Sequence, residues 1–252
     1  MLVLDKIVKK YGSLYAAKNV SLTLEDGQSL VLVGESGSGK TTAARTAAGM
    51  LAPDEGKILL DGRELAHTCR RRSFDDCARI QYIFQDPYSA LDDGRTVRAA
   101  LEETARICRR HRHPCLTAEE ALSYVDQNLV FGIDRPVREF SGGQGQKICI
   151  ARALMPFPQI IIADEATSML DRQSGNDVFS LLGRIKREKG ISILAILHDI
   201  DFSGGYWDRI AVMHRGEIVE ERDFSRFPES AVHPYSRELL NAYEYFNGRI
   251  HV

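Results

Sequence analysis

Apolar and polar residues alternate along the first part of the chain. In residues 20–25 (VSLTLE) the apolar side chains fall on one face and the polar side chains on the other. This period of two predicts antiparallel strands with one face exposed to water. Residues 30–33 (LVLV) are apolar throughout and predict a buried strand. Residues 42–49 (TAARTAAG) predict a short helix that ends at a glycine.

The middle of the chain follows a helical pattern. Between about residues 86 and 157 the pattern is mostly helical, and Val97, Leu101, Thr104 and Cys108 follow a spacing of three or four residues. Residues 117–120 (TAEE) form a capping box, which predicts the start of a further helix.

Short apolar strands return after this helical stretch, in QIIIADE, SILAILHD and RIAVMHRGEIVE, the last with a hairpin turn at Arg215-Gly216. Helical segments separate the first two, which predicts parallel strands with crossovers. The sequence therefore predicts an α/β protein with a mixed β-sheet core, an N-terminal antiparallel β subdomain and an inserted α-helical subdomain. We assign residues 1–85 and 159–252 to the core and β subdomain, and residues 86–158 to the helical insert of a single domain.

Composition excludes several classes of protein. The 252 residues carry a net charge of −2 and give a pI near 6.4, which disfavours nucleic acid as a partner. No apolar run approaches the roughly 20 residues of a membrane span, and the N-terminus lacks the apolar region of a secretory signal, so we expect an intracellular protein. The five cysteines contain no CxxC and indicate reduced thiols. The segment CRRHRHPC holds soft metal ligands, but its arginines favour a solvated basic helix end over a metal site.

A glycine-rich loop follows the buried strand at residues 30–33. Residues 34–41 (GESGSGKT) fit the pattern G-x-x-x-x-G-K-[ST] between a strand and a helix, which predicts a P-loop NTPase core. The loop's N–H groups can converge on phosphate, Lys40 adds a positive charge, and the Thr41 hydroxyl can ligate Mg²⁺. The predicted phosphate-binding residues are Gly34, Glu35, Ser36, Gly37, Ser38, Gly39, Lys40, Thr41 and Thr42.

Two further motifs fit the same chemistry. QIIIADE delivers Asp164 and Glu165 at the end of a buried strand, where Asp164 can hold Mg²⁺ and Glu165 can polarise the attacking water. FSGGQ is a second glycine-rich loop that enters a helix, and residues 141–144 (SGGQ) offer a hydroxyl and N–H groups without a lysine. This second loop can assist a phosphate that another element already holds.

In their order and spacing these motifs resemble the ATP-binding cassette family over nearly the whole chain. GESGSGKT resembles its Walker A loop, IIIADE its Walker B strand, FSGGQ its signature and SMLD, residues 168–171, its D-loop. Gln85 resembles the Q-loop residue, His198 the switch histidine, and Tyr11 the aromatic residue that stacks on adenine.

The resemblance implies ATP and Mg²⁺ as cofactors, with Thr41, Gln85 and Asp164 at the metal and Glu165, His198 and Gln85 in catalysis. It also implies a head-to-tail pair of cassettes, in which Ser141, Gly142, Gly143 and Gln144 contact the ATP of the partner subunit. The family often has an arginine directly after SGGQ and another two residues later, where this chain has Gly145 and Lys147. The family's usual EPTS is EATS in this chain, with Ala166 in place of the proline. These departures remove no phosphate or metal ligand.

Two segments resemble the peptide/nickel importer branch of the family: QDPYSALDDGRTV, residues 85–97, and HPYSRELL, residues 233–240. This resemblance implies import of peptides, nickel or metal chelates, with two permeases, a second cassette and, indirectly, an extracytoplasmic binding protein as partners. It places the chain at the cytoplasmic face of the cell membrane, and Tyr88 and Leu91 in a groove that receives a permease helix. No cysteine follows Cys149, so we expect no iron–sulfur cluster. The alternative from another class is an ATPase accessory of a soluble enzyme complex, resembling phosphonate lyase or iron–sulfur assembly systems.

Overall fold

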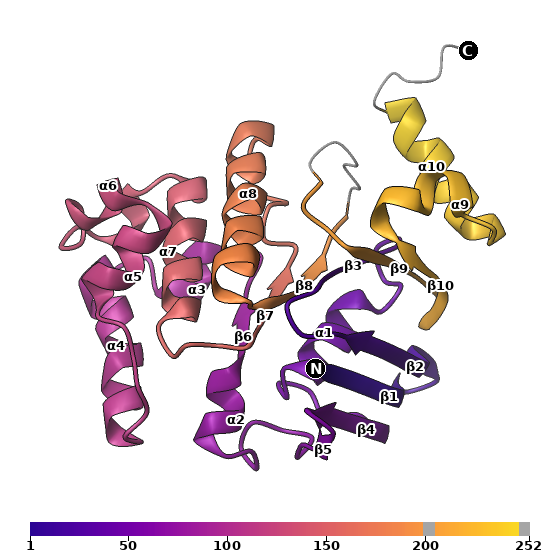
Figure 1. Cartoon of the computed structure of the whole chain (residues 1–252), viewed down its shortest axis with the longest axis horizontal. Helices are drawn as coiled ribbons and strands as arrows, with labels where there is room; N and C mark the ends of the chain where they lie inside the picture. The colour runs from indigo at the N-terminus through magenta and orange to yellow at the C-terminus, as the bar shows by residue number, and fades with distance from the viewer. Residues whose placement is uncertain (199–204, 247–252) are drawn as a thin grey trace. The chain divides into compact units, whose positions relative to one another are not determined.

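The computed structural model describes residues 1–198 and 205–246. They form two compact units, Met1–Arg71 with the described residues from Ser192 onward, and Arg72–Ile191. The elements of each unit can be followed in Figure 1.

The first unit contains an antiparallel sheet in the strand order β2-β1-β4-β5. Its strands are β1 (Leu2–Tyr11), β2 (Leu14–Leu24), β4 (Glu55–Leu60) and β5 (Arg63–Glu64). The alternation predicted for residues 20–25 is confirmed, because Val20, Leu22 and Leu24 are buried while Ser21 is exposed. The sheet therefore has one wet face and one core face.

The first unit also contains the parallel strands that hold the first glycine loop. Strand β3 (Ser29–Val33) is buried at all five positions and pairs in parallel with β8 (Ser192–Ile196) and β9 (Arg209–His214). Strand β10 (Glu217–Asp223) returns antiparallel to β9 through the predicted turn, where Arg215 and Gly216 both have positive φ (48° and 84°). Helix α1 (Lys40–Ala47) follows β3, and η3 (Phe224–Arg226), α9 (Phe227–Ser230) and α10 (Pro234–Phe246) follow β10. The predicted mixed sheet is confirmed.

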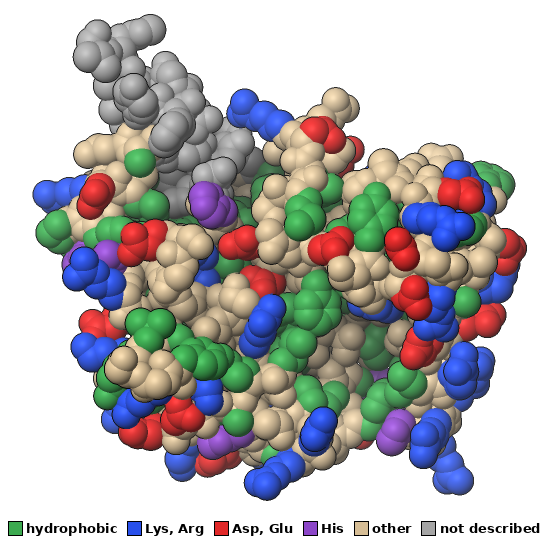
Figure 2. All heavy atoms as spheres, turned by 180° about the vertical axis from the view of Figure 1, so that it is seen from behind, with side chains coloured by type: hydrophobic (Ala, Val, Ile, Leu, Met, Phe, Trp, Pro, Cys, Tyr) green, Lys and Arg blue, Asp and Glu red, His purple; other side chains and the backbone are tan. Residues whose placement is uncertain are grey.

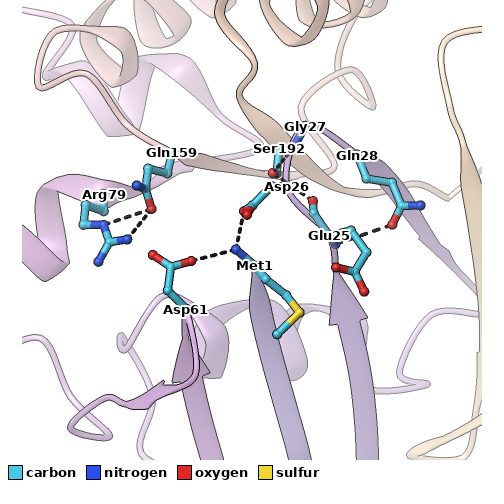
Figure 3. Close-up of polar contacts among 9 residues, drawn as sticks. All are labelled: Met1, Glu25, Asp26, Gly27, Gln28, Asp61, Arg79, Gln159 and Ser192. Atoms are coloured by element: carbon cyan, nitrogen blue, oxygen red, sulfur yellow. Dashed lines mark hydrogen bonds and ion pairs between the residues drawn. The ribbon is translucent and has the colours of Figure 1, made fainter.

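Polar contacts fix the start of these strands (Figure 3). The Ser192 hydroxyl accepts the Gly27 N–H at 2.9 Å and donates to the Glu25 carbonyl at 3.0 Å, which ties the first residue of β8 to the turn before β3. The Met1 amine lies between two carboxylates, with Asp61 Oδ1 at 2.8 Å. These contacts satisfy polar groups where the chain enters the sheets.

The second unit is mostly helical, as predicted for residues 86–157. Its helices are α2 (Phe74–Arg79), α3 (Pro87–Leu91), α4 (Val97–Arg110), α5 (Ala118–Val125), α6 (Gln127–Val130), η1 (Val137–Glu139), α7 (Gly142–Leu154) and α8 (Arg172–Lys189). The predicted capping box is confirmed at Thr117 and Glu120, where each side chain binds the backbone N–H of the other residue. Helix α4 buries Val97, Leu101 and Cys108 of the predicted series, and Thr104 is half-buried.

Two parallel strands of the second unit carry the acidic motif. Strand β6 (Ile80–Ile83) pairs with β7 (Ile160–Asp164) from Ile80 opposite Ile160 onward. At the strand starts, the Arg79 guanidinium donates to Gln159 Oε1 at 2.9 and 2.5 Å, also drawn in Figure 3. This contact lies where the two strands begin to pair, and their register decides which side chains meet at their carboxyl ends.

Surface chemistry is mixed. Figure 2 shows acidic and basic side chains interspersed over the face it presents. Among residues 1–198 and 205–246, none of the helices combines the length and the apolar composition that a membrane span requires.

Candidate functional site

The first glycine loop lies between β3 and α1, as the motif requires. Lys40, the first residue of α1, is 4% exposed, and its ammonium donates to the carbonyls of Gly34 at 2.6 Å and Glu35 at 2.9 Å. The lysine therefore folds back over the loop and closes it. No side chain caps the start of α1, where Gly39 has a φ of 107°, and no acidic residue lies in its first turn. A helix start of this kind favours an anion.

Backbone from β9 and from the turn between β9 and β10 holds the loop in place. The Gly216 N–H donates to the Ser38 carbonyl at 2.9 Å. Gly34 has a φ of +146°, and a Cβ at this position would lie 2.1 Å from the Met213 carbonyl oxygen. Glycine at the first position of the loop is thus required both by its backbone conformation and by the close approach of β9.

The acidic pair ends strand β7. Asp164 is 6% exposed, and its Oδ2 accepts the Tyr82 hydroxyl of β6 at 2.5 Å. Glu165 follows with a φ of 48°, a left-handed conformation that is uncommon for a residue other than glycine. The chain thus turns sharply after the strand, and such backbone strain is concentrated at functional sites.

The Q-loop and D-loop residues meet in the second unit. The Gln85 side chain donates to the Ser168 hydroxyl at 2.8 Å, and that hydroxyl donates to the Glu165 carbonyl at 3.0 Å. Three predicted motifs are therefore joined by one chain of hydrogen bonds, and the backbone of Glu165 lies at its end. The sequence order of the motifs did not reveal these contacts.

The second glycine loop is an N-terminal cap of helix α7. The Ser141 hydroxyl accepts the Gln144 N–H at 3.3 Å, and Gln144 Oε1 accepts the Ser141 N–H at 3.0 Å. A Cβ on Gly143 would lie 3.0 Å from the Ser174 Cβ of α8, and one on Gly142 would lie 3.1 Å from the Leu170 side chain. The loop is held by its own side chains and by the start of α8.

Two further predicted site residues, Tyr11 and His198, are exposed at the ends of strands. Tyr11 ends β1, is 53% exposed, and its ring centroid lies 5.9 Å from the Lys9 ammonium. His198 is exposed just after β8. The structure places Tyr11, residues 34–42 and His198 in the first unit, and Gln85, residues 141–144, Asp164 and Glu165 in the second.

Some sequence expectations need correction or extension. Leu91 is 2% exposed, so the prediction that it lines a groove for a permease helix is wrong: apolar packing within the chain accounts for it. The Tyr88 hydroxyl donates to the Phe140 carbonyl at 2.8 Å, just before the second glycine loop. Tyr82 is a residue that the sequence analysis missed, since no motif marks a tyrosine on the neighbouring strand.

The CRRHRHPC segment is held by its neighbours in the second unit. The His111 ring stacks on Phe74 at 4.4 Å. The His113 ring nitrogens lie 3.0 Å from the Asp75 carboxylate and 3.0 Å from the Pro156 carbonyl. Within the described ranges, no group of three or more His, Cys, Asp or Glu side chains is placed to hold a metal ion.

Comparison with known proteins agrees with the motifs. Residues 17–168 match the family model described as ABC transporter. The chain belongs to the ABC transporter family. Solved cassettes share the fold. One is the MJ0796 cassette in a dimeric post-hydrolysis state bound to ADP and Pi, which this ABC ATPase matches with 27% identity and a TM-score of 0.71. The match covers 89% of this chain and 99% of the MJ0796 chain. The ABC ATPase covers 97% of the ADP conformation of the MJ1267 cassette, at 26% identity, a TM-score of 0.77 and 95% of this chain.

Relatives with curated names refine this assignment. The ABC ATPase is 36% identical over 230 residues to the putative oligopeptide transport ATP-binding protein YkfD of Bacillus subtilis, covering 90% of this chain and 70% of YkfD. It is 37% identical over 235 residues to the oligopeptide transport ATP-binding protein OppF of Streptococcus pyogenes, covering 90% and 75%. A third relative is the glutathione import ATP-binding protein GsiA of Pectobacterium atrosepticum, 37% identical over 235 residues, covering 90% and 37%. These relatives confirm the resemblance to the peptide importer branch.

Proposed function

We propose that this ABC ATPase is the ATP-hydrolysing subunit of an importer that drives the uptake of oligopeptides through partner permeases. One observation carries the proposal, namely 36–37% identity over 90% of the chain with ATP-binding proteins named for oligopeptide transport. The segments at residues 85–97 and 233–240 support the same branch. Nickel and metal chelates were also expected from the sequence, but the names of the relatives favour peptides.

The proposed assembly has a second cassette, which is another copy of this chain or a different one, and two permeases. An extracytoplasmic binding protein delivers the solute, and the ATPase works at the cytoplasmic face of the cell membrane. The dimeric MJ0796 cassette, which shares the fold, supports the paired arrangement. The predicted division into a core and an insert at residues 86–158 belongs to the same proposal.

The first glycine loop fits the phosphates of ATP. Lys40 is a buried cation at an uncapped helix start, and the first turn of that helix has no acidic residue, so the helix start favours a polyphosphate. Residues 34–42 bind the phosphates, and the Tyr11 ring, which is exposed, stacks on the adenine. Thr41, Gln85 and Asp164 would hold Mg²⁺, which would neutralise charge on the phosphates.

The acidic turn supplies the base. Glu165 orients and polarises the attacking water, and His198 contacts the γ-phosphate. The left-handed backbone of Glu165 supports this role, because it turns the residue out of the buried strand at the point where a base is needed. Residues 141–144 serve the ATP of the partner cassette.

Affinity purification and uptake measurements test this proposal together. The tagged chain, isolated from detergent-solubilised cells, should bring down two multi-span permeases and a sibling cassette, whereas a soluble enzyme core without membrane proteins would overturn the importer. Cells that lack the gene should lose uptake of a labelled tetrapeptide, and the wild-type gene but not Lys40→Ala should restore it. Normal peptide uptake together with lost nickel uptake would refute the proposed solute.

A further inference from the structure

The C-terminal segment of the first unit reaches the Walker A loop. The link starts at Glu220 of β10, which is 5% exposed. Its carboxylate accepts the N–H groups of Val232 at 2.9 Å and His233 at 3.1 Å, the last residues before helix α10. The start of α10 is therefore fastened to the sheet.

Tyr235, in the first turn of α10, projects from this fixed point to the loop. Its hydroxyl oxygen accepts the backbone N–H of Glu35 at 2.8 Å. Its ring lies against His214, the last residue of β9, with centroids 3.9 Å apart and an interplanar angle of 31°. His214 Nδ1 in turn lies 3.2 Å from the Glu35 carboxylate. Two side chains thus converge on the second residue of the loop.

The hydrogen bond to Glu35 acts on a single peptide unit. The Glu35 N–H and the Gly34 C=O belong to the same planar peptide, in which they point in opposite directions. The Lys40 ammonium donates to that Gly34 carbonyl at 2.6 Å. One rigid peptide is therefore hydrogen-bonded to Tyr235 through its N–H and to Lys40 through its C=O.

Through this peptide, Tyr235 acts on the position of the Lys40 ammonium. If the peptide rotates, the Gly34 carbonyl turns away and the ammonium loses this hydrogen bond, while the one to the Glu35 carbonyl is 2.9 Å long. Donation of the N–H also polarises the peptide and makes its carbonyl a stronger acceptor. Burial is the main reason that the pKa of the Tyr235 phenol is raised, so the group is a neutral hydroxyl whose oxygen accepts the Glu35 N–H.

We propose that Tyr235 is a positioning residue for Lys40. By holding the Gly34–Glu35 peptide, it sets the place from which the ammonium meets the nucleotide phosphates, and the segment at residues 233–240 supports the Walker A loop. The proposal rests on the proposed role of Lys40 in phosphate binding, so its test treats the two separately.

The variant Tyr235→Phe removes the hydroxyl and keeps the ring against His214. We expect the affinity for Mg·ATP, measured by titration calorimetry on the full chain, to fall about three- to tenfold, as the loss of one neutral hydrogen bond predicts. Hydrogen exchange at the Glu35 amide should accelerate in the same variant without nucleotide. Tyr124→Phe is the matched control, since its hydroxyl binds Glu188 at 2.8 Å in the second unit. It should change neither measurement.

The outcomes separate the two proposals. If Lys40→Ala no longer binds Mg·ATP while Tyr235→Phe binds it with wild-type affinity, the positioning role of Tyr235 is overturned and the Walker A assignment stands. If Lys40→Ala binds ATP normally, the Walker A assignment fails, and the positioning role fails with it. Should Tyr235→Phe not fold, the wild-type protein decides: a Glu35 amide that exchanges as fast as that of exposed Ser36 would refute the hydrogen bond.

Discussion

Two glycines of the Walker A loop give a sharp test of how the loop is built. Gly34 and Gly37 both have positive φ, at +146° and +81°. A Cβ on Gly34 would lie 2.1 Å from the Met213 carbonyl oxygen, whereas one on Gly37 would meet nothing within 4 Å. Alanine at Gly37 therefore strains only the backbone, and alanine at Gly34 strains the backbone and collides with strand β9.

The expected magnitudes differ accordingly. Gly37→Ala should lower the free energy of unfolding by about 1–2 kcal/mol, the cost of a left-handed residue with a Cβ. In Gly34→Ala the Met213 carbonyl cannot retreat freely, because β9 is paired with β3 up to Val212 opposite Val33. Backbone strain and overpacking each contribute about 1–3 kcal/mol, so we expect a total of about 3–5 kcal/mol.

The single tryptophan provides the assay. Trp207 is 7% exposed and belongs to the same unit as the loop, so its fluorescence reports unfolding of the unit that carries both substitutions. Urea titrations of the wild type and the two variants give the free energies directly. Values for Gly34→Ala and Gly37→Ala within about 1 kcal/mol of each other would refute the argument from close approach.

Three further predictions follow from single residues. Glu165→Gln should retain ATP binding and lower hydrolysis by at least about 10²-fold in the assembled transporter, and normal turnover would exclude Glu165 as the base. Burial of Glu220 opposes its ionisation, but hydrogen bonds from the backbone N–H groups of Val232 and His233, with the Ser236 hydroxyl and Arg222 nearby, outweigh it and hold the pKa of Glu220 below its usual value of 4.5. The stability from this carboxylate is present above pH 4.5 and is lost as the pH falls through the folded pKa, so acid titration should destabilise the wild type more than Glu220→Gln. Burial raises the pKa of Cys149 to about 12. A thiol reagent at pH 8 should therefore modify exposed Cys69 in the folded protein, and Cys149 only after unfolding. Equal modification rates of the two cysteines in the folded protein would contradict the buried position of Cys149.

Local sequence was sufficient for the elements that carry the motifs. The strand before GESGSGKT, the helix after it and the capping box at Thr117 depend on residues within a few positions of one another, and each is present. The hairpin turn at Arg215 and Gly216 is equally local, because both residues must adopt positive φ.

Contacts between distant residues could not be predicted in this way. Tyr82 and Asp164 are 82 positions apart, and they meet only because β6 and β7 are neighbours in parallel register. Tyr235 and Glu35 are 200 positions apart. Periodicity shows which face of an element is buried, but the pairing of elements decides what lies against that face. The burial of Leu91 was missed for the same reason.

The two glycine-rich loops of the chain differ in what completes them. In the first, Lys40 binds the carbonyls of its own loop, so a cation is already in place where the helix start favours an anion. In the second, Ser141 and Gln144 satisfy each other's N–H groups.

The second loop also has close neighbours. A Cβ on either of its first two glycines would come within about 3 Å of the side chain of Leu170 or Ser174, as the distances of 3.1 and 3.0 Å show. That loop is thus preformed without a ligand and carries no charge of its own, since residues 140–146 (FSGGQGQ) contain no basic residue. A preformed, uncharged set of donors adds little binding energy alone but aligns a phosphate whose charge is balanced elsewhere. This asymmetry is the physical reason to propose that the first loop binds nucleotide and the second completes a site on a partner cassette.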